Sequence, residues 1–249
     1  MARKFGPRQL KREPSPGFWP IHRKEYTWAP RTRPGPHARE KSLPLVVIAR
    51  ESLGLANIAK EAIRIINQGK VKVDGVVRRD RRFPVGLMDI VQIEGIPQVY
   101  RALPKPNRGL VLSPAQDKEA TYKICKIVGK QNVPGGKLQY SLHDGRTLLS
   151  TAKDTRPGGE ELAVGGAIQL SFPAQKIVKY VPFQVGALGL VIDGRNQGYY
   201  GKISSITPGT YARRKIVRIE TGTESFETPA EYVIPVGTDS PLVTLEKRL

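Results

Sequence analysis

The alternation of apolar and polar positions predicts two short helices between residues 42 and 93. From Leu55 to Ile66, apolar side chains recur at intervals of three and four, which is the period of a helix with one buried face. Lys60 and Arg64 lie on the opposite face of that helix. A shorter helix is expected to start at Pro44, because proline suits the first turn of a helix. This region therefore predicts a compact helical pair with a basic outer side.

The same region continues into a predicted hairpin. Gly69 follows the second helix, where a left-handed residue often ends a helix. Residues 70–73 alternate lysine with valine, as in a half-buried strand. Asp74-Gly75 is a strong signal for a two-residue turn, and Val76-Val77 begins the return strand. A basic loop follows, and residues 89–93 are expected to form the strand that closes the unit.

Residues 101–182 show the period of two that is typical of strands. We expect a small antiparallel barrel or sandwich with a positive surface, in which Lys123 and Lys126 lie near one outer surface. Leu138, Tyr140 and Leu142 share one face of the next strand. The predicted strands cover residues 120–128, 137–143, 147–150, 167–172 and 175–181.

A third β unit is predicted from residue 183 onward. Its glycine-rich segment, Leu188–Ile206, contains two strands around a turn in which glycines permit positive φ angles. Further strands are expected in residues 215–220 and 224–237. The pattern favours a small β-barrel of five short strands.

The first 41 residues have a different composition. They contain seven prolines, which oppose regular structure by removing amide donors. Both tryptophans, Trp19 and Trp28, are interleaved with the basic residues here. Such an arm is suited to neutralising phosphates and stacking on nucleotides. The aromatic side chains could equally pack the arm onto the protein's own surface.

The charge of the chain supports a polyanionic partner. Forty-one Lys and Arg against 22 Asp and Glu give a formal charge of +19. Nucleic acid is the commonest partner for such an excess. An anionic membrane surface is disfavoured, because the basic residues do not follow one long amphipathic helix. The densest cluster is RRDRR, residues 78–82.

Sequence signals of catalysis and metal binding are weak. Cys125 is the single cysteine, so neither an internal disulfide nor a cysteine-based zinc site is expected. The three histidines are far apart in the sequence. Around Gly201-Lys202, Asn196 and Ile203 occupy positions at which a phosphate-binding loop needs glycine and a hydroxyl residue. We therefore expect no enzyme activity, cofactor or metal. The chain also lacks an apolar run long enough to span a membrane and a signal-peptide pattern, which predicts a cytoplasmic protein.

The order of these parts resembles a known family. Residues 42–93 resemble the alpha-L RNA-binding domain, and Leu188–Ile206 resembles a KOW motif. The chain is similar to the S-four-e family of archaeal and eukaryotic small-subunit ribosomal proteins in the order of its motifs. These are a Trp-bearing arm ending in PGPH, followed by VDG, PVGLMD, HDGR and GRNQGYYGKI. The resemblance implies a non-catalytic protein that binds small-subunit rRNA and neighbouring ribosomal proteins. Other alpha-L domains often open their second helix with Ser-Arg, whereas this chain has Ile58-Ala59, so their individual contacts do not carry over.

Together these observations predict an α+β, mainly β chain in four parts. They are a basic arm (1–41), an alpha-L domain (42–100), a central β domain (101–182) and a KOW-type β-barrel (183–249). No homo-oligomer is expected. An RNA-modifying enzyme that uses the alpha-L unit for targeting is the alternative. The predicted rRNA-binding residues are Arg8, Lys11, Arg12, Trp19, Arg23, Lys24, Trp28, Arg31, Arg33, His37, Arg50, Lys60, Arg64, Lys70, Lys72, Arg78, Arg79, Arg81, Arg82, Arg195, Asn196, Lys202, Arg213 and Arg214.

Overall fold

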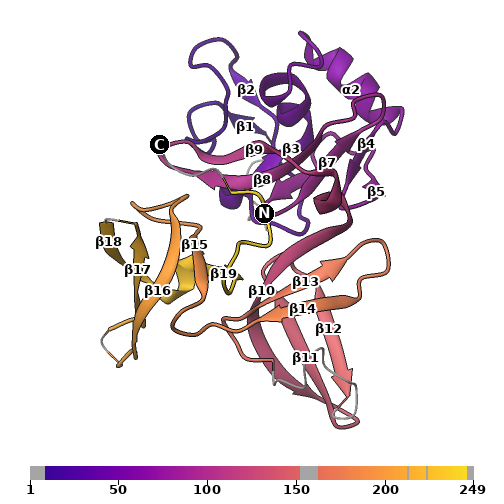
Figure 1. Cartoon of the computed structure of the whole chain (residues 1–249). Helices are drawn as coiled ribbons and strands as arrows, with labels where there is room; N and C mark the ends of the chain where they lie inside the picture. Colours follow the sequence, from indigo (N-terminus) through magenta and orange to yellow (C-terminus); the bar gives the residue numbers. More distant parts are fainter. Residues whose placement is uncertain (1–8, 152–161, 212, 223, 246–249) are drawn as a thin grey trace, which may run out of the picture.

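A computed structural model describes residues 9–151, 162–211, 213–222 and 224–245. The described chain is mostly β, as predicted, with few helices (Figure 1). Its strands form three five-stranded sheets and two small two-stranded sheets. The three large sheets follow one another along the sequence, so each is built mainly from one continuous stretch of chain.

The first unit contains the arm, the helices and the first large sheet. The arm forms a two-stranded sheet, and the α-helical and π-helical segments lie within residues 45–67. The large sheet has the order β5-β4-β7-β8-β9, and β3 pairs separately with β6. The elements are β1 Leu10–Lys11, β2 Trp28–Ala29, β3 Ser42–Pro44, α1 Leu45–Val47, a π-helical turn Ile48–Ser52, α2 Ala59–Asn67, β4 Val71–Val73, β5 Val76–Val77, β6 Pro84–Gly86, β7 Ile90–Ile93, β8 Val99–Lys105 and β9 Gly109–Ala115.

The second helix begins later than the hydrophobic period predicts. α2 starts at Ala59, because the backbone of Ile58 is still extended, with φ −113° and ψ 143°. Ile58 is therefore 59% exposed instead of lying on a buried helical face. The Glu61 carboxylate turns back and accepts hydrogen bonds from the backbone N–H groups of Asn57 and Ile58. These bonds satisfy amide groups that a helix start leaves without partners.

The hairpin prediction is confirmed. Gly69 ends α2 with a φ of 82°, and β4 pairs with β5 around Asp74-Gly75. Both turn residues have positive φ angles, as a tight turn between twisted strands requires. The sheet then continues through β8 and β9, so strand pairing reaches Ala115, beyond the predicted boundary at residue 100.

The central and C-terminal sheets match most of the predicted strands. The central order is β12-β11-β10-β13-β14, and the C-terminal order is β18-β17-β16-β15-β19. Within the described residues, β18 and β19 are the two edges of an open sheet and do not pair with each other. The strands are β10 Tyr122–Val133, β11 Lys137–Leu142, β12 Thr147–Thr151, β13 Ala167–Ser171, β14 Ile177–Val181, β15 Leu188–Val191, β16 Tyr200–Thr207, β17 Ile216–Thr221, β18 Glu224–Pro229 and β19 Val233–Gly237.

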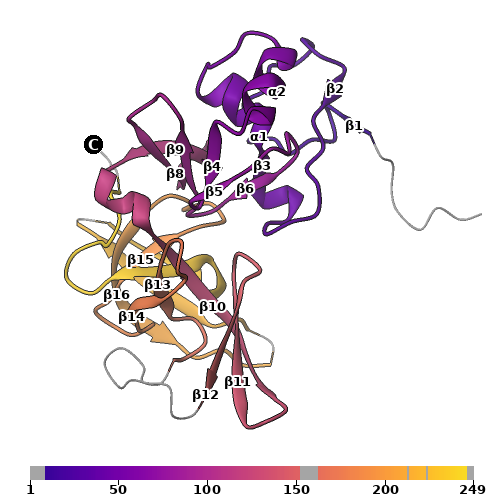
Figure 2. The same cartoon turned by 90° about the vertical axis from the view of Figure 1, so that its right-hand side faces the viewer.

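One apolar core joins the three units. It combines Met88 from the turn before β7, Leu103 from β8, Ile124 from β10, and Leu190 and Ile234 from the C-terminal sheet. All of these side chains are buried. Figure 2 shows β10 running from the first unit into the central sheet, beside the C-terminal strands. The units are therefore packed together rather than connected only by linkers.

Candidate nucleic-acid interface

The predicted basic loop lies between β5 and β6. Its middle residue, Asp80, accepts a hydrogen bond from the Arg82 backbone N–H at 2.9 Å. The Asp80 carboxylate also pairs with Arg33 of the arm at 2.9 Å. Arg79 and Arg81 are exposed, whereas Arg78 is half-buried with its guanidinium 4.4 Å from the centre of the Phe83 ring. Asp80 thus holds the loop while Arg79 and Arg81 remain exposed.

The outer face of α2 adds further positive charge. Lys60 and Arg64 are exposed, one helical turn apart, and they line a shallow depression with Asn67 and Gln68. Lys70, in the turn before β4, and Lys72, on β4, are also exposed. The space beside Gly69 is occupied by the Arg79 guanidinium, 3.3 Å from where a β-carbon would lie. The C-terminal end of α2 and the basic loop therefore form one continuous surface.

The arm packs against this unit. Trp19 is only 2% exposed, and its indole N–H donates to the Ser42 carbonyl at 2.9 Å. The Arg12 guanidinium donates to the Ile21 carbonyl at 2.7 and 3.0 Å and to the Ser15 hydroxyl at 3.0 Å. The remaining predicted arm residues differ in exposure: Lys11, Arg23, Lys24, Trp28 and Arg33 are exposed, and Arg31 is half-buried, as is Arg50 on the helical turn.

Burial corrects the prediction for two residues. Trp19 packs in the core of the first unit, and His37 is buried against Asp89, at 3.1 Å between Nε2 and Oδ1. His37 also lies flat on Gly86, where any β-carbon would come within 2.2 Å of the ring. Neither side chain is on the surface, so both act inside the fold. Arg8 lies outside the described residues.

The predicted residues of the C-terminal unit are separate from this surface. Arg195 and Asn196 lie in the turn after β15, Lys202 is exposed on β16, and Arg213 and Arg214 lie between β16 and β17. Figure 1 shows that sheet on the far side of the molecule from α2. The structure therefore forms one basic surface around α2 and the 78–82 loop, and a second group on the C-terminal sheet.

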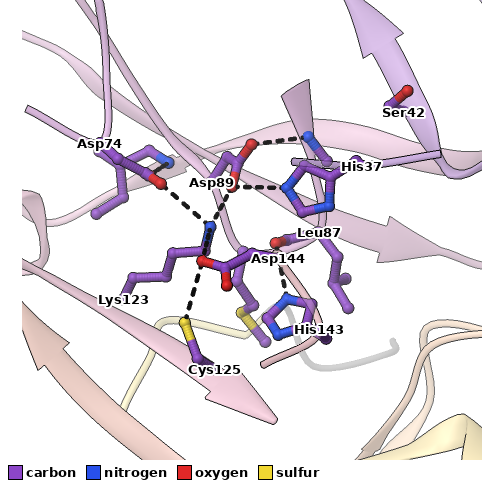
Figure 3. Close-up of polar contacts among 12 residues, drawn as sticks. His37, Ser42, Asp74, Leu87, Asp89, Lys123, Cys125, His143 and Asp144 are labelled. Carbon is purple, nitrogen blue, oxygen red and sulfur yellow. Dashed lines mark hydrogen bonds and ion pairs between the residues drawn. The ribbon is translucent and has the colours of Figure 1, made fainter. Parts of the chain in front are cut away.

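Beneath the surface, a buried charged network joins the units (Figure 3). Lys123 on β10 is 1% exposed at its side chain and contacts three carboxylates. Its Nζ lies 3.1 Å from Asp74, 3.2 Å from Asp144, and in very short contact with Asp89. Asp74 also accepts the Ile90 N–H at 3.0 Å, and Arg146 reaches Asp74 at 2.8 Å and Asp144 at 3.4 Å.

The network shifts the titration of its members. Burial alone would raise the pKa of Asp89, but Lys123 and His37 outweigh it and hold the pKa below the usual range. The pKa of Asp144 is lowered in the same way, by Lys123, against the effect of burial. Burial would lower the pKa of Lys123, but the surrounding carboxylates raise it instead. Burial and the neighbouring Asp89 charge raise the pKa of Asp74 instead. Asp89, Asp144 and Lys123 are therefore the groups that the network holds in their ionised forms.

His143 lies at the edge of this network and is held neutral. Its Nδ1 accepts the Lys126 backbone N–H at 3.1 Å, so that nitrogen has no room for a proton. Its Nε2 donates to the Leu87 carbonyl at 3.3 Å. Burial, with a further contribution from Lys123, lowers the pKa of His143 to about 4.

The prediction that Lys123 and Lys126 share an outer surface is wrong. Residues three apart on a strand point to opposite faces, and β10 is buried on both faces from Lys123 to Ile127. Lys126 is also buried; its Nζ donates to the carbonyl oxygens of Ala230 and Glu231, and burial lowers its pKa to about 8. The buried network around Lys123 left one signal in the sequence, the two Asp-Gly turns Asp74-Gly75 and Asp144-Gly145. The aspartates of both turns contact Lys123.

Two further findings concern the described part of the chain. No group of three or more His, Cys, Asp or Glu residues there is arranged to hold a metal ion. Among the same residues, no helix is long and apolar enough to cross a membrane.

Comparisons with known proteins give matches to related families along most of the chain. Three family models match: the RS4NT (NUC023) domain over residues 5–40, the S4 domain over 44–91, and Ribosomal family S4e over 96–177. "Small ribosomal subunit protein eS4" of Ignicoccus hospitalis is 44% identical over 96% of this chain and 95% of that protein. The protein of the same name from Desulfurococcus amylolyticus is 43% identical over 96% of both chains.

A solved structure supports the same relationship. The crystal structure of the 30S ribosomal protein S4e from Thermoplasma acidophilum is 31% identical, with a TM-score of 0.67 over 80% of this chain and 96% of that one. The S4 match coincides with the two helices and the hairpin that form the basic surface. By sequence over nearly its full length, and by fold, the chain belongs to the small ribosomal subunit protein eS4 family.

Proposed function

We propose that this protein is a structural, non-catalytic constituent of the small ribosomal subunit, in the cytoplasm, and that it binds rRNA. The observation that carries the proposal is the full-length similarity to relatives named as small-subunit ribosomal proteins. The same similarity favours this role over an RNA-modifying enzyme. Neighbouring small-subunit proteins are the other expected partners, and neither a membrane nor a second copy of the chain is required.

The proposed RNA contact is the surface formed by α2 and the 78–82 loop. Lys60, Arg64, Arg79 and Arg81 are exposed there, and the loop geometry set by Asp80 keeps the arginines outward. Phosphate neutralisation would supply most of the affinity, and the shape of the helix–hairpin unit would set the orientation. The basic residues of the C-terminal sheet would form a second contact.

The finer domain assignments belong to this proposal. We assign an alpha-L fold to residues 42–100, supported by the order helix, helix, hairpin and by the S4 match. A KOW-type unit for residues 183–249 is supported by five strands and by the glycine-rich turn between β15 and β16. The arm (1–41) and a central β domain (101–182) complete the division.

A salt titration of RNA binding tests the role. If about eight phosphates are neutralised, the slope of log K against log salt concentration should be about −6 to −7. Replacing Arg79 and Arg81 by Glu should weaken binding at least about tenfold and make the slope shallower by about 1.5 to 2. The matched control reverses the charges of Lys176 and Lys179, two exposed lysines at the central sheet. A slope near zero for the unmodified protein would refute the proposal.

A further inference from the structure

A groove separates the arm from the helical part of the first unit. Its volume is about 700 Å³, and the arm strand β2 forms one wall while α1 and the start of α2 form the other. Figure 2 shows β2 beside the helices. The 78–82 loop reaches the groove through Arg81 and Arg82. The volume is within the range of about 300–1,000 Å³ that is typical of small-ligand sites.

The lining of the groove is aromatic and apolar but open to solvent. Tyr26 is 42% exposed, Trp28 is 54% exposed, and Ile58 is 59% exposed. Among the described residues, the only other strongly exposed aromatic side chain is Tyr211. Exposed flat rings gathered at one place offer a stacking surface, whereas isolated exposed apolar residues are common on protein surfaces.

Four arginines (Arg31, Arg50, Arg81 and Arg82) and one carboxylate, Glu25, which hydrogen-bonds Tyr26, line the groove. This excess of positive charge favours a phosphate-bearing occupant. Arg50 is paired with Glu51 at 2.5 Å, and its guanidinium lies 4.8 Å from the centre of the Tyr26 ring. Arg50 therefore fixes the position of that ring. Arg81 is exposed at the rim of the groove. The neighbouring carboxylate, Asp80, is already paired with Arg33, so Arg81 can bind an anion without first breaking that ion pair.

We propose that this groove binds one unpaired nucleotide of RNA, with its base against Tyr26 and Trp28 and its phosphate at Arg81. The proposal rests on the proposed rRNA-binding function and names the RNA feature that the site selects. A base in a continuous duplex has both faces covered by its neighbours, so only a bulged or looped nucleotide can enter. An aromatic platform with a basic rim accepts any base, since each base has a π-face.

Tryptophan fluorescence measures the insertion directly. The protein has two tryptophans, and Trp19 is buried with its N–H bonded to Ser42, so it gives a constant background. Two RNAs are compared, a duplex and the same duplex with one bulged nucleotide. The bulged RNA should quench the Trp28 emission and bind roughly 5- to 100-fold more tightly than the duplex.

A matched pair of variants separates this site from general RNA binding. Trp28→Leu should remove the preference for the bulged RNA and leave binding of the duplex within about twofold, because the basic surface is unchanged. Tyr211→Leu removes an equally exposed aromatic side chain from the C-terminal unit and should retain the preference.

The outcomes are distinct. Equal binding of both RNAs without quenching, or a bulge preference that survives Trp28→Leu, would overturn the groove proposal and leave the rRNA-binding function standing. The first result would also direct attention to a protein segment as the occupant. Failure to bind either RNA would overturn the proposed function together with the groove.

Discussion

Replacing Lys123 by Met should destabilise the protein more than replacing any surface lysine. The substitution keeps the aliphatic stem but removes the ammonium group that contacts Asp74, Asp89 and Asp144. Arg146 then remains as the one cation among the described residues that pairs with this carboxylate cluster, apart from the His37 contact to Asp89. Three buried carboxylates would then share too little positive charge, and they cannot regain water unless the packed units separate.

The expected size follows from the burial. Removing one partner of a buried ion pair costs about 3–5 kcal/mol. For a chain of 150–250 residues, about 1 kcal/mol corresponds to a change in Tm of about 2–4 °C. Lys123→Met should therefore lower Tm by about 6–20 °C. Because the network joins His37 of the arm, the first sheet and β10, the unfolding transition should also become broader or split.

Thermal unfolding followed by circular dichroism measures both effects. Lys179→Met is the matched control, since Lys179 is exposed on β14 and the same side chains are exchanged. Its Tm should stay within about 2 °C of the unmodified protein. Asp144→Asn in the Lys123→Met background should recover part of the loss, because it removes one of the three buried negative charges that Lys123 no longer balances. A Lys123→Met protein as stable as the Lys179→Met protein would refute the role of the network.

Three further predictions concern other buried groups. His143 has a pKa of about 4 in the folded protein, against 6.5 for an exposed histidine. Between these pH values the unfolded chain binds more protons than the folded one. The free energy of unfolding should therefore fall by up to about 3 kcal/mol as the pH drops from 6.5 to 4. Denaturant unfolding at several pH values should show that slope, and His143→Gln, which cannot become charged, should lack this component. Burial raises the pKa of the Cys125 thiol, so thiol reagents should modify it only on unfolding; reaction with the native protein at the rate of a free thiol would contradict its burial. The Glu119 carboxylate accepts hydrogen bonds from buried Arg101 and, at 2.7 Å, from the Thr244 N–H. Glu119→Gln should therefore lower the free energy of unfolding by about 3 kcal/mol and make the C-terminal segment accessible to proteases. The control Glu94→Gln, at an exposed position, should have neither effect.

Local signals in the sequence predicted most of the strands and turns. The Asp74-Gly75 hairpin, the end of α2 at Gly69 and the strand segments of both later sheets are present, because short-range backbone preferences decide them. The predicted start of α2 was too early, since the hydrophobic period cannot reveal that the backbone of Ile58 is extended.

Features that depend on packing between distant segments could not be predicted. Trp19 and His37 are residue types that often contact RNA, and both lie in a basic arm. In the structure both side chains are nevertheless buried against the first unit. Lys123 was assigned to the surface because the alternation of lysine with apolar residues was interpreted as one exposed and one buried face. In the structure, both faces of β10 are buried from Lys123 to Ile127. The exposed Arg79 and Arg81, by contrast, lie where a charged loop next to a hairpin is expected, since four neighbouring arginines cannot all be buried.

Sedimentation with small ribosomal subunits tests the central claim most directly. The purified protein is mixed with small subunits stripped of their own copy and centrifuged through a gradient at physiological salt concentration. We predict that the unmodified protein moves with the subunits and that the Arg79→Glu, Arg81→Glu variant is lost to the top of the gradient. Unmodified protein that stays at the top while the subunits sediment would contradict the account.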